Sequence, residues 1–409
     1  MTLIDVMSSH PDRLFGTIPV NWKRQPHYLS TYYYHENVSR SRRPTSLVQL
    51  FPGPLDSACI QVTASAHASS SVSLSESEER ESISFMNILV IGSGGREHAL
   101  LHVLRKTSSR SLQLFCAPGN PGIAQLATVI PCDATDTGAL AQLAQERAID
   151  LTIVGGEAPL AAGIVDEFER RGLAIAGATL AAARLESSKA FAKDFMARHH
   201  IPTARYKIAD SASEAKDILR RGEFGAQDTP VVVKADGLAA GKGVVVARER
   251  AEALQAIDDL MVQHSAGALA ARRVVIEETL AGPEASLLLF SDGREYALMP
   301  PARDHKRVGE NDTGPNTGGM GAITDRGVID DETLARARRE IIEPTLRGAL
   351  EDNLPFRGVL FVGLMLTADG PRVLEYNVRF GDPEAQAILV RLKSDLVEIF
   401  EAVARGAGL

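Results

Sequence analysis

Short apolar runs alternate with helix-like segments between residues 86 and 178, and this alternation constrains the fold more than any other feature of the chain. The run MNILVIG at 86–92 ends in glycine and predicts a buried parallel strand. Further strands are expected at 112–119, 149–156 and 173–178, with helices at 96–106, 136–148 and 159–172. Strands that alternate with helices of about 10–15 residues indicate βαβ units. We therefore predict an α/β domain with a doubly wound parallel sheet at 86–187.

The remainder of the chain, residues 188–409, predicts an α+β region. A helix is expected at 188–200, and a helical stretch from about residue 332 carries Pro344, which predicts a kink or split at that point. Strand pairs are expected around turns, namely 229–237 with 242–249, 272–280 with 284–293, and two strands within 358–380 joined by ADGP. The chain closes on a predicted helix at 394–405.

Length and composition exclude several classes of protein. The 409 residues, 44% of them hydrophobic, are enough for two or three domains. A net charge of −8 argues against a nucleic-acid or membrane-surface partner, and no apolar run reaches the roughly 18 residues of a membrane span. The three cysteines, Cys59, Cys116 and Cys132, give neither a disulfide framework nor a metal-ligand spacing, which favours a cytoplasmic setting.

Residues 1–85 show no useful periodicity and include a serine-rich stretch, so we predict a largely disordered N-terminal extension. A targeting peptide is one interpretation of its arginines and serines. The alternative is a translated stretch ahead of the real start. Met86 lies directly before the first predicted strand and favours this alternative.

The stretch VLEYNVRFGDPE at 373–384 places three polar side chains on one face of a strand, because alternate side chains of a strand share a face. These are Glu375, Asn377 and Arg379. Magnesium takes hard oxygen ligands, and arginine can bracket a phosphate or carboxylate, so the trio suits a metal beside phosphate oxygens. A solvated strand face is the alternative, and the two further acids of the adjoining turn weigh against it.

The glycine-rich segment VVVKADGLAAGKGVVVA at 231–247 is a second candidate phosphate site. It is not a P-loop, because Gly237 and Gly241 are one residue too close and no hydroxyl residue follows Lys242. Its glycines still allow backbone N–H groups to approach an anion, and Lys234 lies at the end of the preceding strand. An ordinary hairpin loop with a solvated lysine is the alternative.

Two other features suggest ligand binding more weakly. Lys189 opens a predicted helix, where its charge opposes the helix dipole, so a role away from the helix is plausible. Residues 304–322 contain five glycines and no apolar periodicity, which indicates either a functional loop or a flexible solvated one.

The segment IGSGGREHA at 91–99 matches only the start of a dinucleotide fingerprint. Gly92 and Gly94 fit G-x-G-x-x-G, but Glu97 occupies the third glycine position. The hypothesis of a nicotinamide-dependent oxidoreductase is supported by this match alone. Absence of NAD binding would exclude that hypothesis. A strand followed by glycines and a helix can nevertheless bind an anion at the helix N-terminus.

Five segments in this order carry a resemblance to a known family: VIGSGGREHAL, APGN, KADGLAAGKGVVVA, DHKRVGENDTGPNTGGMGA and EYNVRFGDPE. From Met86 to the last residue the chain resembles the phosphoribosylamine–glycine ligases, also called glycinamide ribonucleotide synthetases, of the ATP-grasp superfamily. The resemblance implies a cytoplasmic ligase of de novo purine biosynthesis. It would convert ATP, glycine and 5-phosphoribosylamine to glycinamide ribonucleotide, ADP and phosphate through a glycyl phosphate.

The resemblance also implies how residues share this work. ATP would lie between two lobes of an ATP-grasp domain at 188–409, with 205–275 as a lid-type lobe. The expected ATP-binding residues are Lys189 and Lys234 on phosphate, Gly241, Lys242 and Gly243 in a flap, Glu277, Glu278 and Leu280 at adenine through their backbone, and Glu284 at the ribose hydroxyls. Glu375 and Asn377 would hold Mg²⁺ or Mn²⁺. The expected catalytic residues are Arg379, Lys306 and Asp382, and the expected substrate-binding residues are Gly92, Gly94, Gly95, Arg96, Glu97, Asp304, Arg307 and Gly381.

Family members continue beyond the point that corresponds to Leu409, so the C-terminal small domain is expected to be missing. Two alternatives follow: a non-catalytic ATP-binding fragment, or an ATP-grasp carboxylate–amine ligase with another substrate. The expected partners are small molecules only, and the expected oligomeric state is a monomer or weak dimer.

Overall fold

The computed structural model describes residues 85–239, 243–267, 270–310, 313–406 and 408–409. All of these residues lie in one compact unit, Glu78–Leu409. Residues 1–84, for which the sequence predicts a disordered extension, lie outside the described residues. None of the helices in the described ranges combines the length and the apolar character that crossing a membrane requires.

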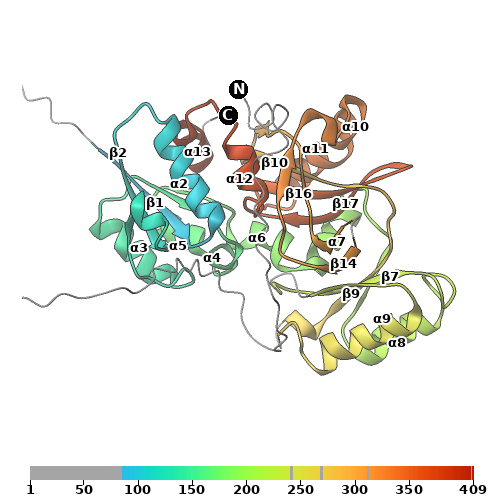
Figure 1. Ribbon diagram of the computed structural model, residues 1–409. Coiled ribbons are helices and arrows are strands. Elements are labelled where there is room, and N and C mark those ends of the chain that lie inside the picture. The colour runs from blue at the N-terminus through green and yellow to red at the C-terminus, as the bar shows by residue number, and fades with distance from the viewer. Residues whose placement is uncertain (1–84, 240–242, 268–269, 311–312, 407) are drawn as a thin grey trace, which may run out of the picture. The chain divides into compact units, whose positions relative to one another are not determined.

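A five-stranded parallel sheet follows the start of the described chain, with the strand order β3-β2-β1-β4-β5 (Figure 1). Its strands are β1 (Met86–Gly92), β2 (Leu112–Pro118), β3 (Thr128–Val129), β4 (Leu151–Val154) and β5 (Ile175–Ala176). The order changes direction at β1, which makes the sheet doubly wound, as predicted. The loop after β1 therefore lies at the switch point, where such sheets bind ligands.

Helices cover both faces of this sheet. Ile88 and Val90 of β1 share a buried apolar cluster with α2 (Gly95–Thr107) and α13 (Leu396–Arg405). The alternate residues of β1 share a second cluster with α3 (Thr137–Glu146) and α5 (Ile164–Arg170). The closing helix α13, predicted at 394–405, thus returns to the first sheet of the described chain.

The single helix predicted at 159–172 is wrong. The structure has two helices there, α4 (Glu157–Ala161) and α5, separated by Gly163. Gly163 adopts a left-handed conformation with φ 81°, which interrupts a right-handed helix and which glycine tolerates without steric cost.

A larger antiparallel sheet has the order β15-β12-β10-β16-β17, with β11 paired to β10. Its strands are β10 (Glu284–Asp292), β11 (Tyr296–Leu298), β12 (Ala302–Asp304), β15 (Ala322–Thr324), β16 (Arg357–Thr367) and β17 (Gly370–Asn377). The pair β16–β17 around the turn ADGP confirms the predicted hairpin. Five helices pack with this sheet: α6 (Leu180–Ser187), α7 (Lys189–Arg198), α10 (Asp331–Ala337), α11 (Glu343–Glu351) and α12 (Glu384–Leu389).

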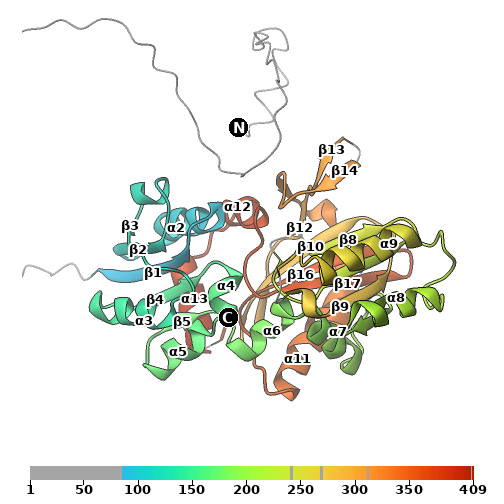
Figure 2. The same ribbon diagram turned by 90° about the horizontal axis from the view of Figure 1, so that it is seen from below.

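A small four-stranded sheet, β6-β9-β7-β8, forms a separate lobe whose helices α8 and α9 pack on one face (Figure 2). Its elements are β6 (Tyr206–Ala209), α8 (Ala212–Arg220), β7 (Val231–Ala235), β8 (Val244–Ala247), α9 (Arg250–Ile257) and β9 (Val274–Glu278). The antiparallel pair β7–β8 confirms the hairpin predicted around the glycine-rich segment.

The second predicted strand pair, 272–280 with 284–293, is wrong, although both segments form strands. β9 pairs with β6 and β7, whereas β10 pairs with β11, β12 and β16. The chain therefore crosses from the small sheet to the large sheet between these strands. The crossing contains Gly282 with φ 148°, a backbone conformation that favours glycine.

The helical stretch near residue 332 is split, as its proline predicted. A π-helical turn, Arg338–Ile342, separates α10 from α11, and Pro344 lies in the first turn of α11. The helical residues continue without a break from this turn into α11, and the turn changes the hydrogen-bond register directly before Pro344, which has no N–H to donate.

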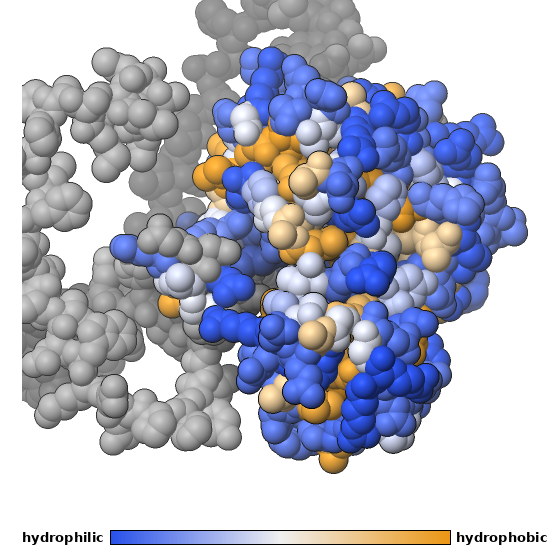
Figure 3. Space-filling model, turned by 90° about the vertical axis from the view of Figure 1, so that its right-hand side faces the viewer, coloured by the Kyte–Doolittle hydropathy of each residue, from blue (hydrophilic) through white to orange (hydrophobic). Residues whose placement is uncertain are grey.

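Apolar side chains outside the core are scattered. On the face seen in Figure 3 they form separate small groups within a mostly hydrophilic surface, which is ordinary for a folded protein surface.

Three buried phenylalanines connect distant parts of the chain. Phe290 of β10 meets Phe380 and Phe400 edge to face, with ring centroids 5.8 and 5.7 Å apart. Phe380 follows β17 and Phe400 lies on α13, so the cluster joins the large sheet to the helix that covers the parallel sheet. Edge-to-face pairs add to the stabilisation that burial provides.

We predict that Phe400→Ala lowers the free energy of unfolding by about 3–5 kcal/mol, because it leaves a cavity beneath two rings. Urea denaturation followed by circular dichroism measures the change. Leu350→Ala on α11 is the control, since Leu350 is 47% exposed and its loss is expected to cost no more than about 0.5 kcal/mol. Equal losses in the two variants would contradict this account of the core.

Candidate functional site

Strand β17 carries the polar face that the sequence predicts. Tyr376 and Val378 are each 2% exposed and belong to the core, and the Tyr376 hydroxyl lies 2.6 Å from the Thr345 hydroxyl. Glu375 and Asn377 point to the opposite side and are partly accessible. The strand has a register shift where Gly363 of β16 pairs with Glu375, which leaves Leu374 opposite no residue of β16.

Four cations surround the Glu375 carboxylate. Burial alone would raise its pKa, but charge interactions with Lys306, Lys234, Lys189 and Arg379 outweigh burial and hold the pKa below its usual value. The cations come from β7, the start of α7, the segment after β12 and the segment after β17. Glu375 is therefore an ionised group at the point where the small sheet, the large sheet and α7 meet.

The two lysines predicted to bind phosphate both reach this point. Lys189 is the first residue of α7, and its Nζ donates to the Gly237 carbonyl at 2.9 Å. Lys234 Nζ donates to the Leu374 carbonyl, directly beside Glu375, at 3.1 Å. Burial lowers the pKa of Lys189.

The glycine-rich segment is only partly described. Gly243 is buried, and its carbonyl accepts from the Ala235 N–H at 2.7 Å. Gly241 and Lys242, predicted in the flap, lie outside the described residues, so their role stays a prediction.

The predicted adenine and ribose residues line the crossing from β9 to β10. Glu277 is 2% exposed and contacts Lys234 at 2.9 Å. Glu278 pairs with Arg205 at 2.6 Å, and Leu280 is half-buried. Glu284, the first residue of β10, lies 3.3 Å from Lys306 Nζ, which brings a predicted ribose ligand beside a predicted catalytic residue.

Two glutamates that the sequence analysis missed hold Arg379. Its guanidinium contacts Glu186 at 2.8 Å, Glu157 at 3.2 Å and the Asn377 side-chain oxygen at 3.2 Å. Glu186 is 8% exposed and also accepts from the Val378 N–H at 2.8 Å. Burial raises the pKa of Glu186, and the charge of Arg379 opposes this. Neither glutamate lies in the five segments that carry the resemblance, so the sequence analysis did not single it out.

The loop after β1 is closed by its own glutamate. Glu97, 2% exposed, accepts from the Gly94 N–H at 2.6 Å and from Arg96 Nε at 2.7 Å. Its side chain fills the space that a Cβ on Gly92 or Gly155 would need. The structure therefore gives Glu97, predicted to bind substrate, a role in holding the loop.

Arg96 and the turn after β17 bring the predicted substrate residues together. Arg96 Nη1 donates to the Phe380 carbonyl at 3.0 Å, and so does Arg379 Nη1 at the same distance. Asp382 lies beside Gly94 and accepts from Gln386 at 2.7 Å. Gly381 packs against the buried Glu384, and Gly95 packs against Gln386.

The glycine-rich segment at 304–322 is more ordered than the predicted loop. It contains a small hairpin, β13 (Arg307–Gly309) with β14 (Thr313–Asn316), and β12 pairs with β15 at its base. Lys306 is fixed through its carbonyl, which accepts from both the N–H and the hydroxyl of Thr317 at 2.7 Å. Arg307 Nη1 donates to the Gly314 carbonyl at 3.3 Å.

Asp304, at the end of β12, is a strongly perturbed acid whose side chain is 8% exposed. Burial, together with the charges of Glu384, Glu284 and Glu375, raises its pKa to about 6, and Lys306 at 3.9 Å opposes the shift. Perturbed acids of this kind gather at functional sites.

The donor set fits a divalent cation that shares its ligands with a nucleotide. The described ranges contain no group of three or more His, Cys, Asp or Glu residues able to enclose a metal by themselves. Magnesium in nucleotide sites usually takes only one or two protein oxygens, the rest coming from phosphates and water. The Glu375 carboxylate and the Asn377 amide oxygen supply such a pair.

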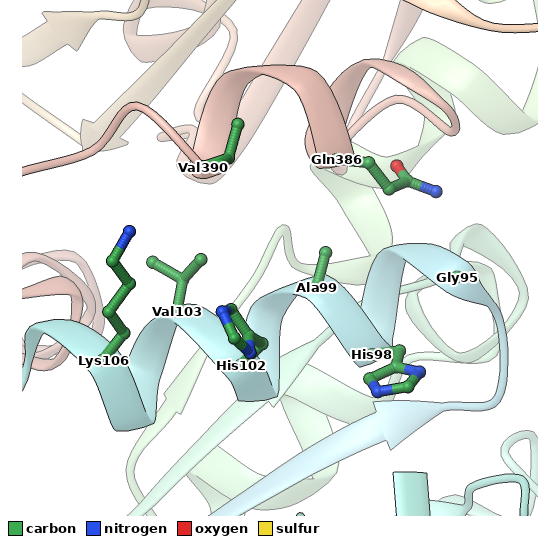
Figure 4. A pocket seen from close by; sticks show the side chains of 8 residues that line it. All are labelled: Gly95, His98, Ala99, His102, Val103, Lys106, Gln386 and Val390. Atoms are coloured by element: carbon green, nitrogen blue, oxygen red, sulfur yellow. The ribbon is translucent and has the colours of Figure 1, made fainter. Parts of the chain in front are cut away.

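A hollow of about 270 Å³ lies away from this charged centre, between α2 and α12 (Figure 4). It is lined by Gly95, His98, Ala99, His102, Val103, Lys106, Gln386 and Val390. Gly95 is the one residue of this lining that the sequence analysis had predicted to bind substrate. The hollow therefore flanks the loop after β1 and does not contain the cations around Glu375.

Comparison with known proteins identifies both parts of the fold. Residues 86–186 match the family described as phosphoribosylglycinamide synthetase, N domain, and residues 187–385 match phosphoribosylglycinamide synthetase, ATP-grasp (A) domain. The second match confirms the predicted ATP-grasp fold.

Similar proteins cover most of the described chain. A phosphoribosylamine–glycine ligase of Agrobacterium fabrum is 50% identical over 321 residues, which are 78% of this chain and 74% of that protein. A solved phosphoribosylamine–glycine ligase of Thermotoga maritima is 30% identical with a TM-score of 0.66, covering 78% of this chain and 76% of that one. A biotin carboxylase of Campylobacter jejuni, 16% identical with a TM-score of 0.60 over 80% of this chain and 72% of its own, shares the fold.

We predict that Asp304→Asn stabilises the protein at pH 7.5 by about 1–2 kcal/mol, because it removes a carboxylate whose ionisation the folded state opposes. The pKa of Asp304 is raised to about 6 in the folded protein, so its contribution to stability falls as the pH rises from about 4 to 6. Urea denaturation at several pH values measures the difference, which is expected to shrink towards pH 4. Equal stability at pH 7.5, or a difference independent of pH, would contradict the assignment.

Proposed function

We propose that this chain, which belongs to the phosphoribosylamine–glycine ligase family, joins glycine to 5-phosphoribosylamine at the expense of ATP. The products are glycinamide ribonucleotide, ADP and phosphate, as in purine biosynthesis. One observation carries the proposal: the ionised Glu375, with Asn377 two positions further on, lies among four cations that come from the small sheet, from the start of α7 and from the ends of two strands of the large sheet.

The chemistry explains why so many cations are needed. A carboxylate is a poor electrophile, so a glycine oxygen first attacks the γ-phosphorus of ATP and the bond to the β-phosphate oxygen breaks, which gives glycyl phosphate and ADP. The amine nitrogen of phosphoribosylamine then attacks the carbonyl carbon, phosphate leaves and the nitrogen loses a proton. Both reactants of the first step are anions, so fixed positive charge lowers its barrier.

The described residues divide into groups that suit these two steps. Lys189 and Lys234, from the start of α7 and from β7, would contact the phosphates of ATP. Lys306 and Arg379 would offset the charge that develops between the γ-phosphate and the glycine carboxylate. Glu375 and Asn377 would hold the divalent cation, which would neutralise phosphate oxygens when bound.

The switch-point loop would receive the second substrate. Gly92 ends β1, and Gly94 and Gly95 lie at the N-terminus of α2. The Gly94 N–H is bonded to Glu97, and the following N–H groups with the helix dipole suit a phosphate. Arg96 ties this loop to Phe380, close to Asp382 and Gly381. Asp304, Arg307 and the small hairpin would close the substrate side of the site.

We place the functional domains at 86–187 and 188–409, with the small sheet as the lid-type lobe over ATP. The pairing of β6, β9, β7 and β8 into a sheet of their own supports this division.

The test is turnover by the purified chain. Coupled detection of ADP is expected to require glycine, freshly prepared phosphoribosylamine and a divalent cation together, with glycinamide ribonucleotide identified by mass spectrometry. Parallel titrations with Mg²⁺ and Mn²⁺ determine the metal, and light scattering tests the expectation of a monomer or weak dimer. A folded chain that binds ATP but forms no ADP with any combination of substrates would overturn the proposal.

We predict that Glu375→Gln lowers kcat/KM for metal–ATP by about 10²–10³-fold, since it removes the charged ligand at the centre of the site. A smaller loss of thermal stability is also expected, because the folded state holds the pKa of Glu375 below its usual value and therefore favours the carboxylate. Asp369→Asn, at the exposed turn before β17, is the matched control, since the Asp369 side chain is 85% exposed. Parallel loss of stability and activity in Glu375→Gln would indicate a structural role instead.

A further inference from the structure

A buried triad of charges lies behind the phosphate-side lysine. Lys193 of α7 contacts one carboxylate oxygen of Glu277 at 3.0 Å, and Lys234 of β7 contacts the other at 2.9 Å. The side chains of Lys193, Glu277 and Lys234 are only 3%, 2% and 9% exposed. Lys193 belongs to none of the groups assigned above.

Both lysines of the triad also reach the backbone of β17. Lys193 Nζ donates to the Thr203 hydroxyl at 2.7 Å, and this hydroxyl donates to the Val373 carbonyl at 2.6 Å. Lys234 Nζ donates to the next carbonyl, that of Leu374, at 3.1 Å. The triad therefore ends on the two residues that precede Glu375, and α7 contacts both β9 and β17 (Figure 1).

The charges of the triad do not cancel. With two cations and one anion, the group has a net charge of +1. Without Lys193, Glu277 and Lys234 would form a neutral pair, and in a buried setting such a pair interacts strongly. The charge of Lys234 would then be neutralised by Glu277, and Lys234 would attract a further anion more weakly than it does in the triad.

We propose that Lys193 is a positioning residue that neutralises Glu277 and thereby leaves the positive charge of Lys234 available to a nucleotide phosphate. The inference rests on the proposed function, in which Lys234 contacts that phosphate. It explains why a lysine is buried on α7, because an apolar side chain of similar length would pack there without the cost of desolvating a charge.

The protonation of Lys193 supports the proposal. Burial lowers the pKa of Lys193 to about 8, Glu277 opposes the shift and Lys234 adds to it. Glu278 of β9 also favours the charged form, and the Tyr206 ring of β6 lies 5.9 Å from Nζ. Lys193 is therefore mainly charged at pH 7 and mainly neutral at pH 9.

Calorimetric titration with ADP in the presence of Mg²⁺ tests the inference without requiring turnover. Lys193→Met is expected to bind ADP about tenfold more weakly than the wild-type chain, the loss of roughly one charge-assisted contact. Lys207→Met on β6 is the matched control, because the Lys207 side chain is 55% exposed and pairs with Glu223 at the surface. The ADP affinity of this variant is expected to equal that of the wild type.

The decisive variant is Lys193→Met combined with Glu277→Gln. It removes one cation and one anion and restores the net charge of +1. The expected adenine contact is made by the backbone around Glu277, which Glu277→Gln leaves in place, so we expect ADP affinity to return to within about threefold of the wild type. A purely structural role for Lys193 predicts the opposite, a double variant that binds as weakly as Lys193→Met or more weakly, and that result would overturn the inference. Unchanged affinity in Lys193→Met would do so as well.

Two further outcomes are covered by the same measurement. If Lys193→Met alone does not fold, wild type and double variant are compared from pH 7 to pH 9, where only the wild type has a Lys193 to discharge. Its affinity is expected to fall relative to that of the double variant, and parallel curves would refute the inference, because every other lysine is present in both proteins. If the wild-type chain binds no ADP at all, the proposed function itself fails.

Discussion

The ionised carboxylate of Glu375 is the group on which the arrangement of the site depends. Burial opposes its charge, so it must be surrounded by cations, and the chain supplies them from segments that are far apart in sequence. Two of those cations have an anion further out: Glu277 lies beside Lys234, and Glu186 lies beside Arg379. Around Glu375, cations and anions therefore alternate from the centre outwards.

This arrangement depends on the way the two sheets are joined. The loop after β1 and the turn after β17 could move independently if they belonged to separate bodies. Instead, α13 packs on the parallel sheet and Phe400 contacts the rings of Phe290 and Phe380 from the large sheet. Arg96 then has a fixed carbonyl to bind, that of Phe380. The apolar core therefore sets the distances between charged groups that share few direct contacts.

Much of the fold could be predicted from the sequence, because periodicity and glycine positions are local properties. The doubly wound sheet, the hairpin β16–β17 and the polar face of β17 were all predicted in this way. Strand pairing is not local, and for this reason β9 and β10 were wrongly paired with each other, although both were correctly predicted as strands. The supporting residues Glu186, Glu157 and Lys193 were missed for the same reason, since only the folded chain brings them to their partners.

Two glutamates in family motifs differ in where their partners come from. The resemblance assigns Glu97 to substrate and Glu375 to the metal. Glu97 has its carboxylate oxygens bonded to Gly94 and Arg96, its own neighbours, and is 2% exposed, so in this structure it holds the loop. Glu375 is partly accessible, and the charges that stabilise it come from other segments of the chain. An acid whose partners are local fixes the backbone, whereas an acid that is stabilised by distant cations can exchange part of that stabilisation for a bound metal.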